Sequence, residues 1–468
     1  MMTLILFLIY IAMILAVILF ERKNPTEALL WVIVLICLPG LGMVLYLIFG
    51  NTLSIKITAA IRTKRLKQLE APFGSSPISQ EIITNLSDSD QQVMQFNHHY
   101  NGSELTCYNT ASIYTTGKSH YEALFNDIAN AKECIYVEFY TSHHDQIGQA
   151  FIQALTQKAR QGVKVLVLCD FIANIATPNK MFKPLRQAGG HVIRVKPYFT
   201  HYRSHRKIVV IDHNISFIGG MNIGKQYANL AKKKNPWRDT QVRMEGACCL
   251  ALDRYFLTDW LCSIHKKDIS STLQYIQSLA YPKYHSTQQL CQFVVGGVDT
   301  DKEGVKMCYL SMIRSAKHHI RIQTPYFIPD TSVLDALKTA LATGVAIEIM
   351  VPGISASFFL DPVTNYYCGQ LLEYGATVNK YEGYIHAKTM IIDEELCCIG
   401  SVNLDMRSLM VDDEVCGVFY DNELVNRYLK IFKEDLIKTR PYTYQEFINR
   451  STKEKLMESI FVLFAPLF

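Results

Sequence analysis

The stretch HRKIVVID at residues 205–212 is repeated in outline as HAKTMIID at residues 386–393. Each copy is followed by a Gly-[Gly/Ser]-x-Asn element, which places an asparagine 17 residues after the histidine, at Asn222 and Asn403. A single His-x-Lys-x4-Asp match arises by chance in roughly a few per cent of chains of this size. Two copies with the same downstream element indicate a shared chemical role.

The sequence around the two motifs is duplicated as well. A β-branched run at residues 135–140 corresponds to one at 320–324, and a run at 162–168 corresponds to one at 344–350. Helical patterns lie between the runs of each copy, as is typical of βαβ units. The copies are 182 to 185 residues apart, whereas solenoid repeats span only about 20 to 50 residues. The sequence therefore predicts an α/β protein with two homologous domains.

Strand geometry gives the motif spacing a physical meaning. Side chains at positions i and i+2 of a strand point to the same face. His205 and Lys207 can therefore face one pocket, and so can His386 and Lys388.

The aspartates of the motifs have a different place. Asp212 and Asp393 fall at an odd offset from their histidines, where each strand meets a turn. We expect them to fix that turn and not to touch substrate. A return strand then brings Asn222 or Asn403 to the same edge as the histidine.

Composition narrows the class of protein. The chain has 468 residues, enough for two to four domains, and its 49% apolar and 19% charged residues lean towards membrane contact and exclude a disordered or collagenous chain. The net charge of +5 suits anionic surfaces but is far below that of a strongly basic nucleic-acid binder. Thirteen cysteines form no CxxC pair, which favours reduced thiols on the cytoplasmic side.

The N-terminus contains two uncharged apolar runs, at residues 3–20 and 28–49. Each is close to the roughly 20 residues that cross a bilayer as a helix, so residues 1–50 are predicted to form a transmembrane hairpin. A cleaved signal peptide is the alternative, but no basic residue precedes the first run. Pro39-Gly40 interrupts the second run, so a kink or a re-entrant dip is an alternative to a straight helix there.

Basic residues follow the hairpin. Five of them occur between residues 56 and 67, against two in the loop between the apolar runs and none before the first. By the positive-inside bias the body of the protein is cytoplasmic. Residues 51–105 are predicted to be a basic juxtamembrane segment on anionic lipid and a linker, with a plain solvated linker as the alternative.

With these features the sequence resembles the phospholipase D superfamily, in which an HxKxxxxD motif occurs twice and both copies form one active site between two similar α/β/α domains. More narrowly it resembles bacterial-type cardiolipin synthases, through the apolar N-terminal segments and through WRDT at 237–240, TPYFIP at 324–329 and NLDMRS at 403–408. It departs from the family at Asp412, where an asparagine is usual, and around residues 355–359, where an acidic residue is often seen.

The resemblance also divides the chain. It implies a first phospholipase D-like domain at residues 106–265, a linker at 266–290 and a second such domain at 291–440, packed as a pseudo-dimer behind two transmembrane helices. Residues 441–468 are a C-terminal tail whose apolar end is predicted to be a membrane-surface anchor, with a core strand as the alternative. The implied location is the bacterial inner membrane, with several crossings and cytoplasmic catalytic domains.

The residues of the motifs suit chemistry on a phosphodiester. A site for this anion must neutralise its oxygens, supply a nucleophile and protonate the leaving alcohol. Two lysines and two asparagines meet the first need. One neutral imidazole can attack phosphorus to give a phosphohistidine, while the other, protonated, donates to the leaving oxygen. No metal ion or other cofactor is required.

The resemblance assigns the roles within this site. The catalytic residues it implies are His205, Lys207, Asp212, His386, Lys388 and Asp393, with Asn222 and Asn403 binding phosphate. It favours His205 as the nucleophile and His386 as the general acid and base, although the sequence itself is symmetric on this point. It also implies a carboxylate behind each imidazole. Glu414 is the candidate for His386 and Asp239 the candidate for His205, and an ordinary ion pair with Arg238 is the alternative for Asp239.

The function implied is a membrane-embedded phosphatidyltransferase that joins two phosphatidylglycerol molecules into cardiolipin and releases glycerol. Its partners would be phosphatidylglycerol and anionic membrane lipids. A phospholipase D that uses water, or a transferase that uses another alcohol, shares the covalent step and stays open as an alternative. A phosphodiesterase acting on nucleic acid is disfavoured, because the chain has an apolar hairpin and no concentrated basic, aromatic-studded groove. A membrane scaffold with an inactive fold is disfavoured by the two complete motifs.

Overall fold

The computed structural model describes residues 2–20, 25–50, 59–64, 83–196, 203–231, 236–282, 289–297, 303–354, 357–420 and 422–467. The predicted basic juxtamembrane segment lies largely outside these ranges, including three of its five basic residues, Lys56, Arg65 and Lys67.

Within the described ranges, fifteen strands form the main sheet. Those of the first domain are β1 (Thr106–Tyr114), β2 (Cys134–Phe139), β3 (Lys164–Asp170), β4 (His191–Val195), β5 (Ile208–Ile211), β6 (Ile215–Gly219) and β8 (Gln241–Gly246). Those of the second are β9 (Gln289–Gly296), β10 (His319–Gln323), β12 (Ala346–Pro352), β13 (Thr377–Tyr381), β15 (Thr389–Ile392), β16 (Leu396–Gly400), β18 (Glu414–Phe419) and β19 (Thr439–Tyr442).

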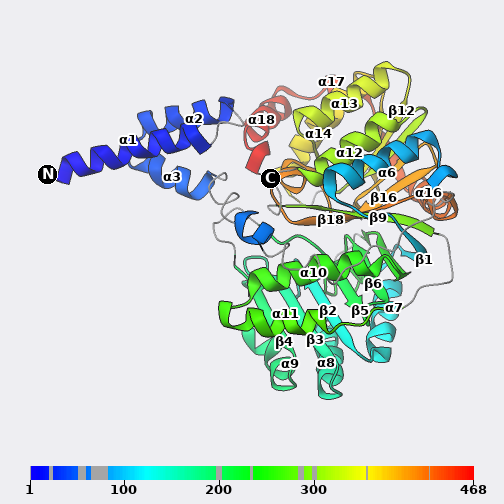
Figure 1. Ribbon diagram of the computed structural model, residues 1–468. Helices are drawn as coiled ribbons and strands as arrows, with labels where there is room; N and C mark the ends of the chain where they lie inside the picture. Colours follow the sequence, from blue (N-terminus) through cyan, green and yellow to red (C-terminus); the bar gives the residue numbers. More distant parts are fainter. Residues whose placement is uncertain are drawn as a thin grey trace.

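The strand order confirms the duplication. From the outer edge inwards, the first domain has the order β4-β3-β2-β5-β6-β8-β1 and the second has β13-β12-β10-β15-β16-β18-β9, with β19 added outside β13. At the centre β1 pairs antiparallel with β9. The two homologous domains therefore share one continuous mixed sheet, with helices on both of its faces (Figure 1).

Helices cover the sheet in a matching way. One face carries α7 (Gly117–Asn130), α8 (Gln146–Arg160) and α9 (Lys183–Gln187) in the first domain, and α12 (Gly304–Ser315), α13 (Thr331–Ala342) and α14 (Leu360–Leu372) in the second. The other face carries α10 (Cys249–Ser263) and α11 (Ile269–Gln277) in the first domain and α16 (Asn422–Leu436) in the second. The described part of the two domains also contains the helices α6 (Asp88–Asn101), α15 (Met406–Met410), α17 (Tyr444–Ile448) and α18 (Thr452–Val462). It has 3-10 turns at η1 (Asn179–Phe182), η2 (Lys266–Asp268) and η3 (Ala465–Leu467).

The core explains why the apolar runs became strands. Every residue of β2 is buried, and its alternate side chains divide between two cores: Ile135 and Val137 pack under α7 and α8, whereas Tyr136 packs under α10. A strand covered on both faces needs such a continuous apolar run. The core under α10 extends to α16 of the other domain, so one apolar cluster spans both domains.

The N-terminal region forms three helices beside the two domains (Figure 1). They are α1 (Met2–Phe20), α2 (Pro25–Cys37) and α3 (Leu41–Phe49). The second apolar run is therefore two helices, broken where Pro39-Gly40 had indicated an interruption, because proline lacks an N–H and Gly40 has a φ of 83°. Across the described part of the chain, no helix combines the length and the hydropathy needed to cross a bilayer.

The segments predicted as linker and tail carry structure. Residues 266–290 include α11, which packs on the first domain, where the hydroxyls of Tyr275 and Tyr136 lie 2.6 Å apart. Residues 441–468 include α17 and α18 on the second domain, and Tyr442 pairs with Val378 of the sheet.

Candidate active site

The two histidine segments meet where the domains face each other. The backbone N–H of His205 donates to the carbonyl of Asp413 at 2.9 Å, and that of His386 donates to the carbonyl of Arg238 at 2.6 Å. The second contact continues a two-stranded sheet in which β7 (Trp237–Arg238) pairs with β14 (Tyr384–Ile385) across the domain boundary. Each histidine is thus placed by main chain from the other domain.

The carboxylates behind the imidazoles are exchanged between the domains. Nδ1 of His205 lies 2.6 Å from Oε1 of Glu414, and Nδ1 of His386 lies 2.7 Å from Oδ2 of Asp239. Both carboxylates are candidates that the sequence supplied, but the expected pairing of each with the histidine of its own copy is wrong. The reason is the main-chain pairing across the boundary, which sets each carboxylate beside the other copy's histidine.

The alternative role of Asp239 is not found. The side chain of Arg238 forms its ion pair with Asp435, at 2.7 Å, and donates to the main-chain oxygen of Asp239, not to its carboxylate. The Asp239 carboxylate also accepts from the Thr240 N–H at 2.8 Å and from the Trp237 indole N–H at 3.3 Å.

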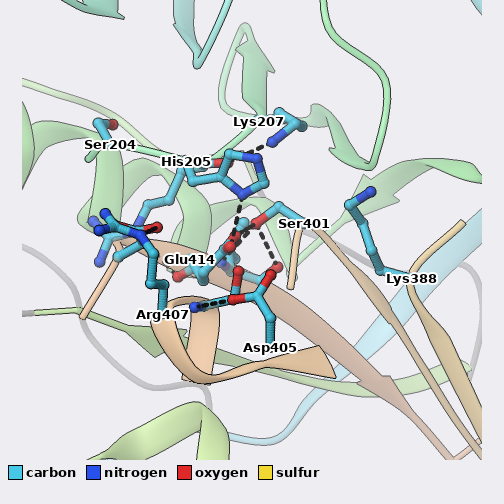
Figure 2. Close-up of polar contacts among 12 residues, drawn as sticks. Ser204, His205, Lys207, Lys388, Ser401, Asp405, Arg407 and Glu414 are labelled. Carbon is cyan, nitrogen blue, oxygen red and sulfur yellow. Dashed lines mark hydrogen bonds and ion pairs between the residues drawn. The ribbon is translucent and has the colours of Figure 1, made fainter. Parts of the chain in front are cut away.

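The two lysines have equivalent environments. Nζ of Lys207 donates to the carbonyl of His205 and Nζ of Lys388 to that of His386, both at 2.6 Å. Figure 2 shows both lysines beside the His205–Glu414 pair. Both side chains are fully buried, which lowers the pKa of Lys207 to about 8 and that of Lys388 to about 7.

A cavity of about 290 Å³ borders both imidazoles. It is lined by Tyr140, Thr141, His205, Asn222, Tyr227, Tyr326, Ile328, Leu360, His386, Asn403, Asp405, Arg407, Ser408 and Asp412. Both predicted histidines and both predicted asparagines are therefore brought together. Asn222 accepts from the Thr141 N–H at 3.1 Å, whereas the buried Oδ1 of Asn403 has no hydrogen-bond partner among the described residues.

The motif aspartates lie elsewhere. The Asp212 carboxylate accepts from the backbone N–H groups of residues 132–134 at 2.7 to 3.0 Å, and that of Asp393 accepts from residues 317–319 at 2.5 to 2.7 Å. Both residues open turns with positive φ, 51° and 49°. Neither lines the cavity, so the structure gives them the turn-fixing place expected from their spacing and not one against substrate.

The imidazoles themselves are held neutral. Burial, and next the nearby Lys207 and Lys388, hold the pKa of His205 well below its usual range. Burial and Lys388 lower the pKa of His386 to about 3.

The two carboxylates differ in their pKa. Burial raises the pKa of Glu414 to about 8, despite the neighbouring Lys207. Burial acts on Asp239 in the same direction, but His386, Lys388 and the Thr240 N–H outweigh it and leave the pKa of that carboxyl lowered. The pKa of Glu414 is therefore raised and that of Asp239 is lowered, so the two carboxyls behind the imidazoles lose their protons at different pH.

The copies also differ 15 residues after each histidine, although the hydrogen bond from Ser401 lowers the pKa of Glu414 and so opposes the effect of burial. Ser401 donates its hydroxyl to Glu414, and the equivalent Gly220 has no side chain because a Cβ there would overlap the Asp239 carboxylate. The Gly/Ser difference between the copies was visible in the sequence, but its meaning depends on which carboxylate lies against it.

The sequence analysis assigned no role to several residues close to the two imidazoles. The ring of Tyr140 lies 4.7 Å from that of His205, and the ring of Trp237 lies 4.9 Å from that of His386. Asp412, where the sequence departs from the family, pairs with Arg407 at 2.7 Å. Aromatic residues at strand ends are common, so only the contact with an imidazole distinguishes these.

Comparisons with known proteins give matches over nearly the whole chain. A family model described as cardiolipin synthase, PLD-like domain, matches residues 124–236 and 309–436, and a phospholipase D-nuclease N-terminal model matches residues 8–51. The chain is 35% identical to the major cardiolipin synthase ClsA of Bacillus subtilis over 98% of each chain. It is 32% identical to the cardiolipin synthase of Listeria welshimeri, over 96% of this chain and 95% of that one.

Among solved structures, the phosphatidylserine synthase of Haemophilus influenzae matches 81% of this chain and 100% of its own length. Its TM-score is 0.65 and its sequence identity is 16%, so it supports the fold alone.

Proposed function

Since the chain belongs to the cardiolipin synthase family of proteins with phospholipase D-like domains, we propose that it joins two phosphatidylglycerol molecules into cardiolipin and releases glycerol. It is a phosphatidyltransferase that works through a phosphohistidine. The observation that carries this function is the single cavity lined by two imidazoles, one from each domain, each held at Nδ1 by a carboxylate of the other domain.

The first half of the reaction loads one histidine. Because a carboxylate occupies Nδ1 of each imidazole, Nε2 is the atom that can react with phosphorus. One Nε2 attacks phosphorus, the bond from phosphorus to the glycerol oxygen breaks, and the other imidazole gives that oxygen a proton. The ammonium groups of Lys207 and Lys388 each keep donors beyond the one bound to main chain, and with Asn222 and Asn403 they stabilise the phosphoryl oxygens.

The second half restores the enzyme. The imidazole that gave up its proton takes one from the hydroxyl of the second phosphatidylglycerol, whose oxygen attacks phosphorus as the phosphorus–nitrogen bond breaks. Binding of the anionic diester offsets the two lysines, so it raises the pKa of the imidazole that acts as acid.

An experiment can decide which of the two histidines attacks phosphorus and which one gives up the proton. The family resemblance favours His205 for the attack. The raised pKa of Glu414 favours His386, because a protonated carboxyl donates to Nδ1 of His205 and leaves the imidazole proton on Nε2, the atom that would have to attack. The labelling experiment in the Discussion separates these assignments.

We also propose that the protein lies in a bacterial inner membrane through its N-terminal apolar region, with two crossings and with the catalytic domains in the cytoplasm. The excess of basic residues after the second apolar run supports this orientation. Substrates that keep their acyl chains in the bilayer need a cavity close to its surface.

An aromatic patch supports this contact. It consists of Phe358, Phe359, Phe461, Leu463 and Phe464, and includes part of the C-terminal tail that we propose as a surface anchor. Phe358 and Phe359 are 65% and 52% exposed, and their rings lie 5.7 and 5.2 Å from that of Phe461. The next residue, Leu360, lines the catalytic cavity. The patch therefore continues the cavity onto an apolar surface suited to the headgroup region of a bilayer.

The function is tested with the full-length protein in vesicles of labelled phosphatidylglycerol. We expect one cardiolipin and one glycerol for every two phosphatidylglycerol molecules consumed. Phosphatidic acid as the main product would instead make water the acceptor and the protein a hydrolase.

A further inference from the structure

A single arginine ties the N-terminal region to the interface between the domains. Arg62 lies in a helical segment at residues 59–64 between the first and second domains (Figure 1). It is only 5% exposed, and its guanidinium binds both oxygens of Asp413, at 2.8 and 2.6 Å. Its Nη2 also lies 3.2 Å from Asp259. Such a bidentate pair needs the planar fork of arginine.

These groups belong to a buried cluster of balanced charge. Arg206, 1% exposed, pairs with Asp259, lies 3.8 Å from Asp413 and donates to the carbonyl of Glu414 at 3.2 Å. Glu138 lies nearby, where its Oε1 accepts from the Ser204 hydroxyl at 2.6 Å and burial raises its pKa to about 8. Two arginines thus face two aspartates, and removal of Arg62 would leave a buried negative charge.

The cluster lies directly behind a catalytic histidine. Asp413 pairs through its main chain with residues 203–205, accepting the His205 N–H at 2.9 Å, and it precedes Glu414, which holds the His205 imidazole. Gly297 lies so close that a Cβ there would overlap the Asp413 carboxylate. A shift of Asp413 would therefore move both the backbone and the orienting carboxylate of His205.

We propose that Arg62 is a positioning residue for the reaction: by neutralising Asp413 it fixes the segment that orients His205, and it makes the chain that follows the apolar helices part of the catalytic core. This rests on the proposed function only in that His205 takes part in cleaving a phosphodiester. The reaction rate depends steeply on the position of the reacting groups, since a misplacement of about 1 Å can lower it about 100-fold.

The test compares full-length variants in vesicles, with release of p-nitrophenol from a phosphodiester analogue as the readout. Arg62→Gln should lower kcat about 100-fold and leave KM nearly unchanged. The kcat of Arg62→Lys should lie between those of Arg62→Gln and the parent, because an ammonium keeps the charge but cannot bind both carboxylate oxygens in a fork. Lys64→Gln removes an exposed cation from the same helical segment, and its kcat should stay within about twofold of that of the parent.

A pH profile and a double variant separate positioning from a general loss of structure. Asp413 faces Arg62, Arg206, Asp259, Glu138 and Glu414, so without Arg62 the pKa of Asp413 rises. The kcat of Arg62→Gln relative to the parent should therefore be highest at acidic pH and fall as Asp413 ionises. Arg62→Gln with Asp413→Asn restores the charge balance and should regain at least about tenfold over Arg62→Gln alone.

Parental kcat in Arg62→Gln would overturn the proposal. So would a loss of activity that neither low pH nor Asp413→Asn relieves. Because the analogue needs no acceptor lipid, these outcomes are distinct from a failure to form cardiolipin, which would refute the synthase function alone.

Discussion

At the scale of single residues, the two histidines differ in the carboxylate behind them. His205 has Glu414, whose pKa burial raises to about 8, and His386 has Asp239, whose pKa is lowered. A symmetric motif therefore becomes an asymmetric pair of imidazoles. A displacement in two steps needs such a pair, because one nitrogen must attack while the other gives up a proton.

The labelling prediction follows the family resemblance. In His386→Ala, a phosphodiester with a p-nitrophenyl leaving group should load His205, and resolution of the covalent species should be slow because no group deprotonates the acceptor. In His205→Ala we expect neither turnover nor label. Acid-quenched labelling and peptide mapping measure both. Label on His386 in His205→Ala would mean that the proton distribution of the resting site sets the roles.

A second prediction at this scale concerns alkaline pH. A buried lysine with a lowered pKa loses its charge sooner as pH rises, so kcat/KM should fall above about pH 7 to 8 as Lys388 and then Lys207 become neutral. Lys388→Arg keeps its charge in this range, so its remaining activity should decline at higher pH than that of the parent. An unshifted alkaline limb in that variant would assign the decline to another group, such as Glu414.

How far the sequence leads is clearest at these residues. The motif spacing identified both histidines, both lysines and both asparagines, and the family resemblance supplied the two carboxylates. The partner of each imidazole could not be found this way, because spacing along the chain carries no information about pairing across a domain boundary. Arg62 was counted only as a basic residue near the membrane, and its burial against Asp413 depends on contacts 351 residues apart.

At the scale of elements, the two hairpins that follow the motifs are built alike. Asp212 opens the turn between β5 and β6, Asp393 opens the turn between β15 and β16, and each carboxylate holds the start of a parallel strand, β2 or β10. Sequence analysis anticipated the turn from the odd offset. The bonds to the neighbouring strand were hidden because they join segments nearly 80 residues apart.

These bonds give a stability prediction. Asp393→Ala removes the acceptor of three backbone N–H groups and should lower the free energy of unfolding by about 2 kcal/mol. Turnover of the folded protein should change little, since Asp393 does not line the cavity. Thermal unfolding in detergent measures the first effect. Asp335→Ala, an exposed carboxylate on α13, is the matched control, and equal midpoints for the two variants would contradict the structural role.

At the scale of the whole molecule, the duplication predicted from the sequence is present, but its two halves are less separate than expected. The central pairing of β1 with β9 and the apolar cluster shared by α10 and α16 join them into one body. The second apolar run near the N-terminus is divided into α2 and α3 at Pro39-Gly40, where the sequence had indicated an interruption. Of the aromatic patch, the sequence predicted only the C-terminal part. The contribution of Phe358 was missed because it is far from Phe461 in the sequence.

The patch leads to a prediction for the orientation of the whole molecule. Phe358 and Tyr374 lie near opposite ends of α14, a 13-residue helix about 20 Å long. A tryptophan placed at Phe358 should be quenched by brominated lipid in vesicles, and one placed at Tyr374, itself 50% exposed, should not. The measurement is the quenching of the added fluorescence over that of the parent. Equal quenching at the two positions would remove the patch as the membrane-facing side.

The exchange of carboxylates has a consequence for the history of this chain. An ancestor with a single motif could have acted only as a symmetric dimer, each subunit lending its acid to its neighbour's histidine. Once the two copies were fused and had begun to diverge, as Gly220 and Ser401 have, neither copy retained a complete set of its own. Selection then acts on His386 together with Asp239, and on His205 together with Glu414, and each of these pairs has one member in each copy. Neither copy can be lost, or drift to another task, without disabling its twin.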